Sequence, residues 1–137
     1  MAFAETRGSG RRLLQGVAPV EVTLAETVYV GDPLGITSGT WVLSAHTSAE
    51  EPILIAGVGG ASGDIITAYP MAIVEVITTA TNKATVGEKV ALSDVGAYKA
   101  AAATHPDVGF VASIGSDSLT AILFLCPMAA QLTVVRA

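Results

Sequence analysis

One unit of sequence occurs twice in this chain of 137 residues. The stretches VYVGDPLGITSGTW (28–41) and ATVGEKVALSDVGAY (84–98) have the same order of residue types. Each passes from a valine, a glycine and an acid into a short aliphatic run, and then through a polar turn and a glycine to an aromatic residue. A spacing of about half the chain fits two pseudo-equivalent halves that share one core. We therefore predict pseudo-repeats at about 28–78 and 84–125 within one domain, residues 20–137.

Short β-branched and aliphatic runs, separated by glycine and polar turns, predict a mainly β fold with the strand spacing of a compact β-barrel or sandwich-like body. Helical spacing is nearly absent. The run YKAAAAT (98–104) is compatible with either a short helix or an edge strand, so at most one short helix is expected. The expected strands are 20–24, 33–36, 41–44, 53–56, 64–69, 72–78, 89–92, 98–100, 108–114, 118–125 and 131–135. Whether they form one closed barrel or two lobes stays open.

Charge is unevenly distributed along the chain. Residues 1–20 carry three arginines and one glutamate, a balance of +2, which leaves −7 for the remainder of a chain whose net charge is −5. Residues 1–19 contain too little apolar sequence to fold alone, so we expect a flexible, extended N-terminal arm. The acidic body is a poor surface for phosphate, and nucleic acid is an unlikely partner. With 51% hydrophobic and 14% charged residues, much of the surface is expected to be covered by another protein.

No segment of the sequence indicates export or a membrane span. The first 16 residues lack the apolar stretch of a secretory signal, and the uncharged stretch 118–135 is short and interrupted by Pro127. We therefore expect no membrane partner. Cys126 is the single cysteine, which excludes an internal disulfide and is typical of a reducing compartment. Within an apolar run, it is expected to be a buried structural thiol.

Two matched pairs of residues have types that catalysis uses. His46 and His105 follow the aromatic of each repeat, but neither has a second ligand at short metal spacing, so we interpret both as loop residues. Asp32 and Glu88 are matched acids of the kind that glycosidases use. Each follows a glycine where a strand begins, and there an acid side chain typically accepts a hydrogen bond from a backbone amide of a turn.

Two further features resemble ligand sites only superficially. The glycine-rich stretch 57–63 (GVGGASG) is similar to a dinucleotide-binding loop, but it precedes a β-branched run instead of a helix, so a hairpin turn is favoured. Trp41 and Tyr98 occupy equivalent points of the two repeats. Isolated in apolar strands, they are interpreted as anchors of the core or of a subunit interface.

The second repeat contains the segment VGEKVALSDVGAYKAAAATHPDVGFVASIGSDSLTAILF (86–124). This order of glycine turns and apolar strands resembles the head decoration (capsid cement) proteins of tailed bacteriophages. The first half carries a looser copy, and the resemblance covers about residues 28–125. Two departures are the turn GSDS (115–118), which lacks a glycine-aspartate order, and Pro33 in an expected strand. The positions that carry the resemblance are Gly87, Val90, Leu92, Gly96, Val108, Gly109 and Val111.

The resemblance implies a structural virion protein, without enzymatic activity, cofactor or metal, made in the host cytoplasm and bound to the capsid exterior. It would act as a homotrimer that clamps neighbouring subunits of the major capsid protein. The N-terminal arm would pair with the capsid protein by β-augmentation. Arg11 and Arg12 would steer the arm towards an acidic capsid surface, and Leu13, Leu14 and Val17 would fill pockets on the capsid. Arg7 is a further residue of this capsid-binding arm.

Three alternatives remain beside this expectation. The chain is also compatible with a β-module of another virion or surface assembly, such as a tail, fibre or shell component. A small-ligand or carbohydrate-binding β-barrel would use Trp41 and Tyr98 as a stacking surface. A hydrolase would have to combine Asp32 and Glu88 with the two histidines.

Overall fold

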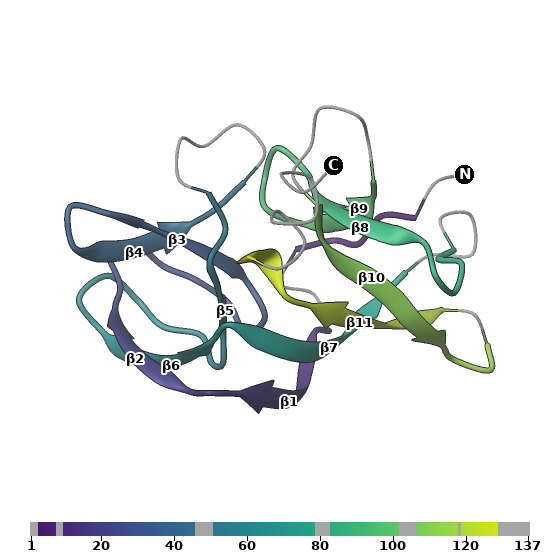
Figure 1. Cartoon of the computed structure of the whole chain (residues 1–137), viewed down its shortest axis with the longest axis horizontal. Helices are drawn as coiled ribbons and strands as arrows, with labels where there is room; N and C mark the ends of the chain where they lie inside the picture. Colours follow the sequence, from purple (N-terminus) through teal and green to yellow (C-terminus); the bar gives the residue numbers. More distant parts are fainter. Residues whose placement is uncertain are drawn as a thin grey trace.

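A computed structural model describes residues 3–7, 10–45, 51–78, 83–101, 107–117 and 119–128. These residues form two antiparallel sheets in a sandwich-like arrangement (Figure 1), and no closed barrel is found among them. The five-stranded sheet has the order β2-β6-β5-β3-β4, and the six-stranded sheet has the order β1-β7-β11-β10-β8-β9. The strands are β1 (Arg12–Val17), β2 (Val20–Thr23), β3 (Pro33–Thr37), β4 (Thr40–Leu43), β5 (Leu54–Ala56), β6 (Ile65–Tyr69), β7 (Met71–Ile77), β8 (Lys89–Leu92), β9 (Tyr98–Ala100), β10 (Asp107–Ile114) and β11 (Thr120–Leu125).

The mainly β prediction is confirmed, and β2 to β11 fall where the sequence placed strands. The run that was compatible with a helix or a strand begins as β9, an edge strand paired with β8. The expected strand 131–135 lies outside the described residues. β1 is the strand that the sequence analysis did not anticipate.

Strand pairing repeats between the two halves of the chain. The first unit, β2 to β6, and the second unit, β7 to β11, place their strands in the same order: first, fifth, fourth, second, third. Figure 1 shows the first unit on the left and the second on the right, joined where β6 runs into β7. The registers also correspond, since Ile36 faces Trp41 in one hairpin and Leu92 faces Tyr98 in the other. The sequence repeat is therefore a duplication of a complete five-stranded unit.

Turns of the form x-x-Gly-acid introduce strands in both units. Gly31 and Gly87 have φ angles of 79° and 90°, which a side chain would strain. The acid that follows accepts a hydrogen bond from the amide three residues earlier. Asp32 Oδ2 lies 2.8 Å from the nitrogen of Tyr29, and Glu88 Oε1 lies 2.7 Å from that of Thr85. The prediction that these two acids stabilise turns is thus confirmed.

The glycine-rich stretch contains a third turn of the same form. Gly63 has a φ of 92°, and Asp64 Oδ2 accepts a hydrogen bond of 2.9 Å from the amide of Ala61. The turn leads directly into β6, so no helix follows it. This agrees with a turn before a strand. A dinucleotide-binding loop is excluded, because such a loop must be followed by a helix.

The N-terminal residues differ from the flexible arm that the charge pattern suggested. β1 pairs along β7 at one edge of the six-stranded sheet. Phe3 and Glu5 flank the opposite edge, where Ala4 bridges Lys99 of β9 and the amide of Ala100 donates to the carbonyl of Phe3 at 2.9 Å. The described residues up to Val17 therefore form a strap that covers both edges of the second unit. A boundary between arm and body at residue 19 does not describe this part of the structure.

Candidate interaction surface

Arg11 is the centre of a buried ionic cluster between the two units. Its guanidinium contacts Glu5 Oε1 at 2.5 Å and also binds Asp32 Oδ1, and all three side chains are completely buried. The carbonyl oxygens of Val30 and Gly96 lie 3.4 and 3.5 Å from its Nη atoms. The cluster thus connects the strap to the glycine turns of both units. This corrects the prediction that Arg11 would steer the protein towards a partner.

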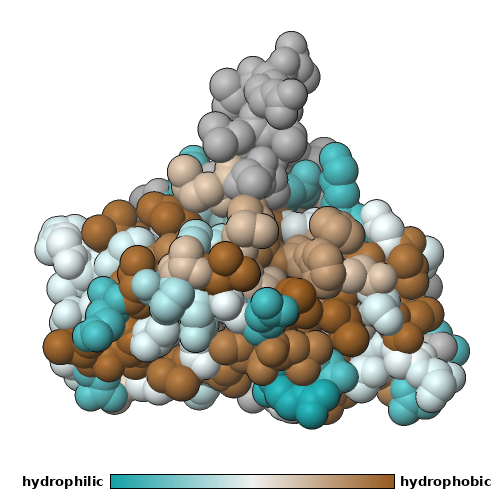
Figure 2. All heavy atoms as spheres, turned by 60° about the horizontal axis from the view of Figure 1, so that its bottom comes forward, coloured by the Kyte–Doolittle hydropathy of each residue, from teal (hydrophilic) through white to brown (hydrophobic). Residues whose placement is uncertain are grey.

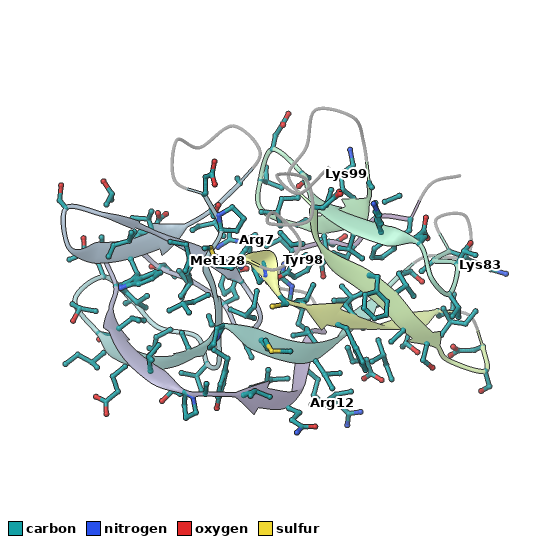
Figure 3. The ribbon with its side chains drawn as sticks, viewed as in Figure 1. Arg7, Arg12, Lys83, Tyr98, Lys99 and Met128 are labelled. Carbon is teal, nitrogen blue, oxygen red and sulfur yellow. The ribbon has the colours of Figure 1, made fainter. Side chains whose placement is uncertain are left out.

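Arg7 extends the same cluster towards the surface. Its Nη2 lies 2.7 Å from Asp32 Oδ2, and its Cζ lies 4.7 Å from the centroid of the Tyr29 ring. Figure 3 shows Arg7 and Tyr98 close together between the two sheets, and Arg12 at the lower edge of the molecule, away from them. Arg7 is therefore bound within the protein and is not presented to a partner, contrary to the prediction.

Tyr98 is fully buried against this cluster. Its hydroxyl donates to the carbonyl of Gly31 at 2.6 Å, its amide donates to Glu5 Oε1 at 3.0 Å, and Arg11 Cζ lies 4.9 Å from the ring centroid. Burial raises the pKa of the Tyr98 phenol well above its ordinary value; the positive charge of Arg11 lowers it, whereas Glu5 and Asp32 raise it further. The phenol is therefore a permanent hydrogen-bond donor at neutral pH.

The pKa of Arg11 reflects two opposing causes. Burial lowers it, because a charged group loses its hydration, but the hydrogen bond to Glu5 and the nearby Tyr98, Glu5 and Asp32 raise it. The balance lies above the ordinary value, so the guanidinium stays charged. The contact between Glu5 and Arg11 could not be predicted from the sequence. Arg11 also binds Asp32, and Glu5 also accepts from the amide of Tyr98, and both of these residues are distant along the chain.

The remaining residues of the predicted arm divide into two groups. Leu13 is half-buried and packs against the core of the six-stranded sheet. Leu14 and Val17 are exposed, and the side chain of Arg12, 3.3 Å from Glu75, is 66% exposed. Among the described residues, no strand pairs with the outer side of β1. An open strand edge with two apolar side chains and one arginine is thus available for binding.

The outer face of the six-stranded sheet carries an apolar hollow of about 560 Å³. Cross-strand neighbours Ile73, Phe124 and Phe110 form its floor, and the two phenylalanine ring centroids lie 5.4 Å apart. Figure 2, which turns the β1 side of the molecule forward, shows hydrophobic side chains over much of the visible surface. The hollow is lined by Gln15, Val17, Met71, Ala72, Ile73, Gly87, Lys89, Asp107, Gly109, Phe110, Phe124, Leu125 and Cys126.

Cys126 lies in this hollow and is half-buried, whereas the sequence predicted full burial. Of the two predicted anchors, Tyr98 belongs to the core and Trp41 is partly buried against the core of the five-stranded sheet. The complete burial of Tyr98 means that these two aromatics do not form one stacking surface. His46 and His105 lie outside the described residues.

The acids of the hydrolase hypothesis are not equivalent in the structure. Asp32 is buried and bound by Arg7 and Arg11, whereas Glu88 is half-buried and holds its turn. In the described part of the chain, no three His, Cys, Asp or Glu residues are grouped as metal ligands. Within these described residues there is also no helix long and apolar enough to cross a bilayer.

The fold and this surface define a duplicated, two-sheet β protein with an open strand edge and an exposed apolar face. A comparison with models of known protein families finds no match. A search of curated proteins likewise finds no significantly similar sequence.

Proposed function

We propose that this protein is a structural component of a phage virion, which binds the outside of an expanded head and stabilises it by clamping neighbouring major capsid protein subunits. The observation that carries the proposal is the open edge of β1, where Leu14 and Val17 are exposed beside Arg12. The sequence resemblance to capsid cement proteins supplies the class of partner. The protein acts as a homotrimer, on the capsid exterior, after synthesis in the host cytoplasm.

The route of attachment follows from the edge position of β1. An unpaired strand edge presents backbone amides and carbonyls that a strand of the capsid protein can pair with. Leu14, on the bulge between Leu13 and Gln15, projects an apolar side chain for a pocket on the partner. Arg12 supplies a positive charge that favours an acidic capsid surface. Since each contact is repeated over the shell, modest individual affinities become strong through multivalency.

The test is co-sedimentation with heads purified from the phage that carries the gene. We expect the protein to bind expanded heads, and Leu14→Asp to abolish binding because it places a carboxylate in an apolar contact. Ile36→Asp is the matched control, since Ile36 is 46% exposed and Leu14 is 42% exposed, but Ile36 lies on β3 of the other sheet. Loss of binding in both variants, or in neither, or absence of binding by the unaltered protein, would refute this assignment.

A further inference from the structure

The two units contact one another inside the molecule through apolar groups. Ile55 of β5 belongs to the first unit, yet it is completely buried in the hydrophobic core of the six-stranded sheet together with Val74 of β7. A Cβ atom added at Gly31, in the turn before β3, would lie 3.2 Å from Val74 Cγ1. The face of the first unit formed by Gly31 and Ile55 is therefore covered by Val74 of the second unit.

The register of the strands identifies the counterpart of this face on the second unit. The amide of Gly31 donates a hydrogen bond to the carbonyl of Ala56 at 2.8 Å. In the equivalent turn of the second unit, the amide of Gly87 donates to the carbonyl of Val111 at 2.7 Å. These acceptors directly follow Ile55 and Phe110, so Phe110 is the counterpart of Ile55. The second unit thus presents the same face through Gly87 and Phe110.

On the second unit this face is uncovered. A Cβ atom added at Gly87 would have nothing within 4 Å, in contrast to Gly31. Phe110 is 45% exposed, whereas Ile55 is 0% exposed. Gly87 and Phe110 both line the apolar hollow, and Phe124 lies beside Phe110 in its floor. The hollow is therefore the unfilled equivalent of the contact that Val74 fills in the first unit.

The group that covers the face also has a counterpart. Val74 pairs with Leu123 of β11, and Val20 pairs with Ala68 at the corresponding place on β6. Val74 is 0% exposed, but Val20 is 45% exposed. The molecule thus carries one filled contact between its units. It also carries on its surface both halves of a second such contact, Val20 and the Gly87–Phe110 hollow, which do not fill one another.

We propose that copies of this chain associate head to tail, with the Val20 region of one copy seated in the Gly87–Phe110 hollow of the next. The contact between copies would continue the contact between units, so it joins two different surfaces and is heterologous. Repetition of one heterologous contact gives a ring where the rotation closes. This assigns surfaces to the self-association within the proposed function, and it is tested without any capsid.

The test compares two variants by sedimentation velocity, alone and mixed. Phe110→Asp places a charge in the hollow, and Val20→Asp places one on the group that enters it; both positions are exposed, so both variants should fold. We expect the unaltered protein to assemble and each variant alone to be monomeric, because burial of an unpaired carboxylate opposes the contact. An equimolar mixture should form a heterodimer, because intact Val20 on one variant meets the intact hollow on the other.

Ile36→Asp serves as the control of matched exposure and should assemble like the unaltered protein. A monomeric unaltered protein would overturn the proposal, as would assembly of Val20→Asp alone or a mixture that stays monomeric. Circular dichroism identifies a variant that fails to fold, and Phe124→Ser, a milder change to the hollow, then replaces Phe110→Asp. Binding of Leu14→Asp to heads reports separately on the capsid contact, so the two proposals can fail independently.

Discussion

Arg11 binds two buried carboxylates at the place where the two units of the molecule meet. Three arginines in a short N-terminal stretch look like an exposed basic patch, but Arg11 compensates two buried carboxylates, Glu5 and Asp32. Removing one partner from a buried ionic group leaves the other charges uncompensated, which costs far more than the loss of an exposed pair. Arg11 and Arg12 are adjacent and chemically identical, yet their environments are opposite.

This contrast gives a direct test. Arg11→Met should lower the free energy of unfolding by about 3–5 kcal/mol, because Glu5 and Asp32 would remain buried without their cation. Arg12→Met should lower it by about 0–1 kcal/mol, because the Arg12–Glu75 pair is largely exposed. Urea denaturation of both variants measures the difference. Equal effects of the two substitutions would show that Arg11 is not the buried centre of the cluster.

Tyr98 predicts a dependence on alkaline pH. The pKa of its phenol is raised in the folded state above the ordinary value of 10.0, so the unfolded chain loses this proton first. The contribution to stability is complete below about pH 10 and is lost as pH rises towards the folded pKa. In Tyr98→Phe, the free energy of unfolding should fall less steeply above pH 10. Parallel curves for the two proteins, measured by denaturation across this range, would contradict the burial of the phenol.

Glu88 tests the turn at the level of a single hydrogen bond. Glu88→Ala removes the acceptor for the Thr85 amide and should destabilise the protein by about 1–2 kcal/mol. Glu88→Gln retains an acceptor oxygen and should cost less than Glu88→Ala. If both substitutions have the same effect in urea denaturation, the hydrogen bond does not stabilise the turn.

At the scale of the element, the sequence predicts strands well where β-branched runs lie between glycine turns. β8 was predicted to the residue, because Gly87 and the polar turn before Gly96 mark its ends. β1 was missed because it begins at Arg12, directly after Arg11, and contains Gly16, so its composition resembles a solvated tail. Gly16 in fact lies against the ring of Tyr69, where any Cβ would fall 2.4 Å from ring carbons.

The strap formed by Phe3 and β1 is expected to be integral to the fold. Phe3→Ala should destabilise the protein by about 3–5 kcal/mol, because Phe3 is buried in the core of the six-stranded sheet. Leu14→Ala, on the same strap but exposed, should change stability by less than about 1 kcal/mol. Thermal unfolding of the two variants measures this. A Phe3→Ala variant as stable as the unaltered protein would indicate that the strap is not docked.

At the scale of the whole molecule, the duplication was visible in the sequence, but its consequence for the surface was not. The repeat predicts that Trp41 and Tyr98 are equivalent, and the registers confirm this. The sequence cannot show that Ile55 is covered while Phe110 is exposed, because coverage depends on how one unit packs on the other. The hollow at Phe110 could therefore be found only from the three-dimensional packing of the two units.

An assembly contact of this kind has a thermodynamic signature. The groups that we expect to meet, Val20 and the Phe110 hollow, are apolar, so self-association should show a negative change in heat capacity. Its affinity should change little with sodium chloride, since salt mainly screens exposed charges. Calorimetric dilution at several temperatures and salt concentrations measures both quantities. A strong loss of affinity at high salt would instead indicate that charged residues hold the copies together.

The pairing of Glu5 with Tyr98 also affects the order in which the chain can fold. The amide of Glu5 donates to the carbonyl of Tyr98 at 3.1 Å, although Tyr98 is synthesised 93 residues after Glu5. Domains generally fold as the chain emerges, and long-range contacts close late. Residues 3–5 must therefore stay undocked until β9 exists, whereas β1 needs only β7 as its partner. The segment around Phe3 and Glu5 therefore docks later than β1 does, and until then the edge of the second sheet at β9 stays open to other chains.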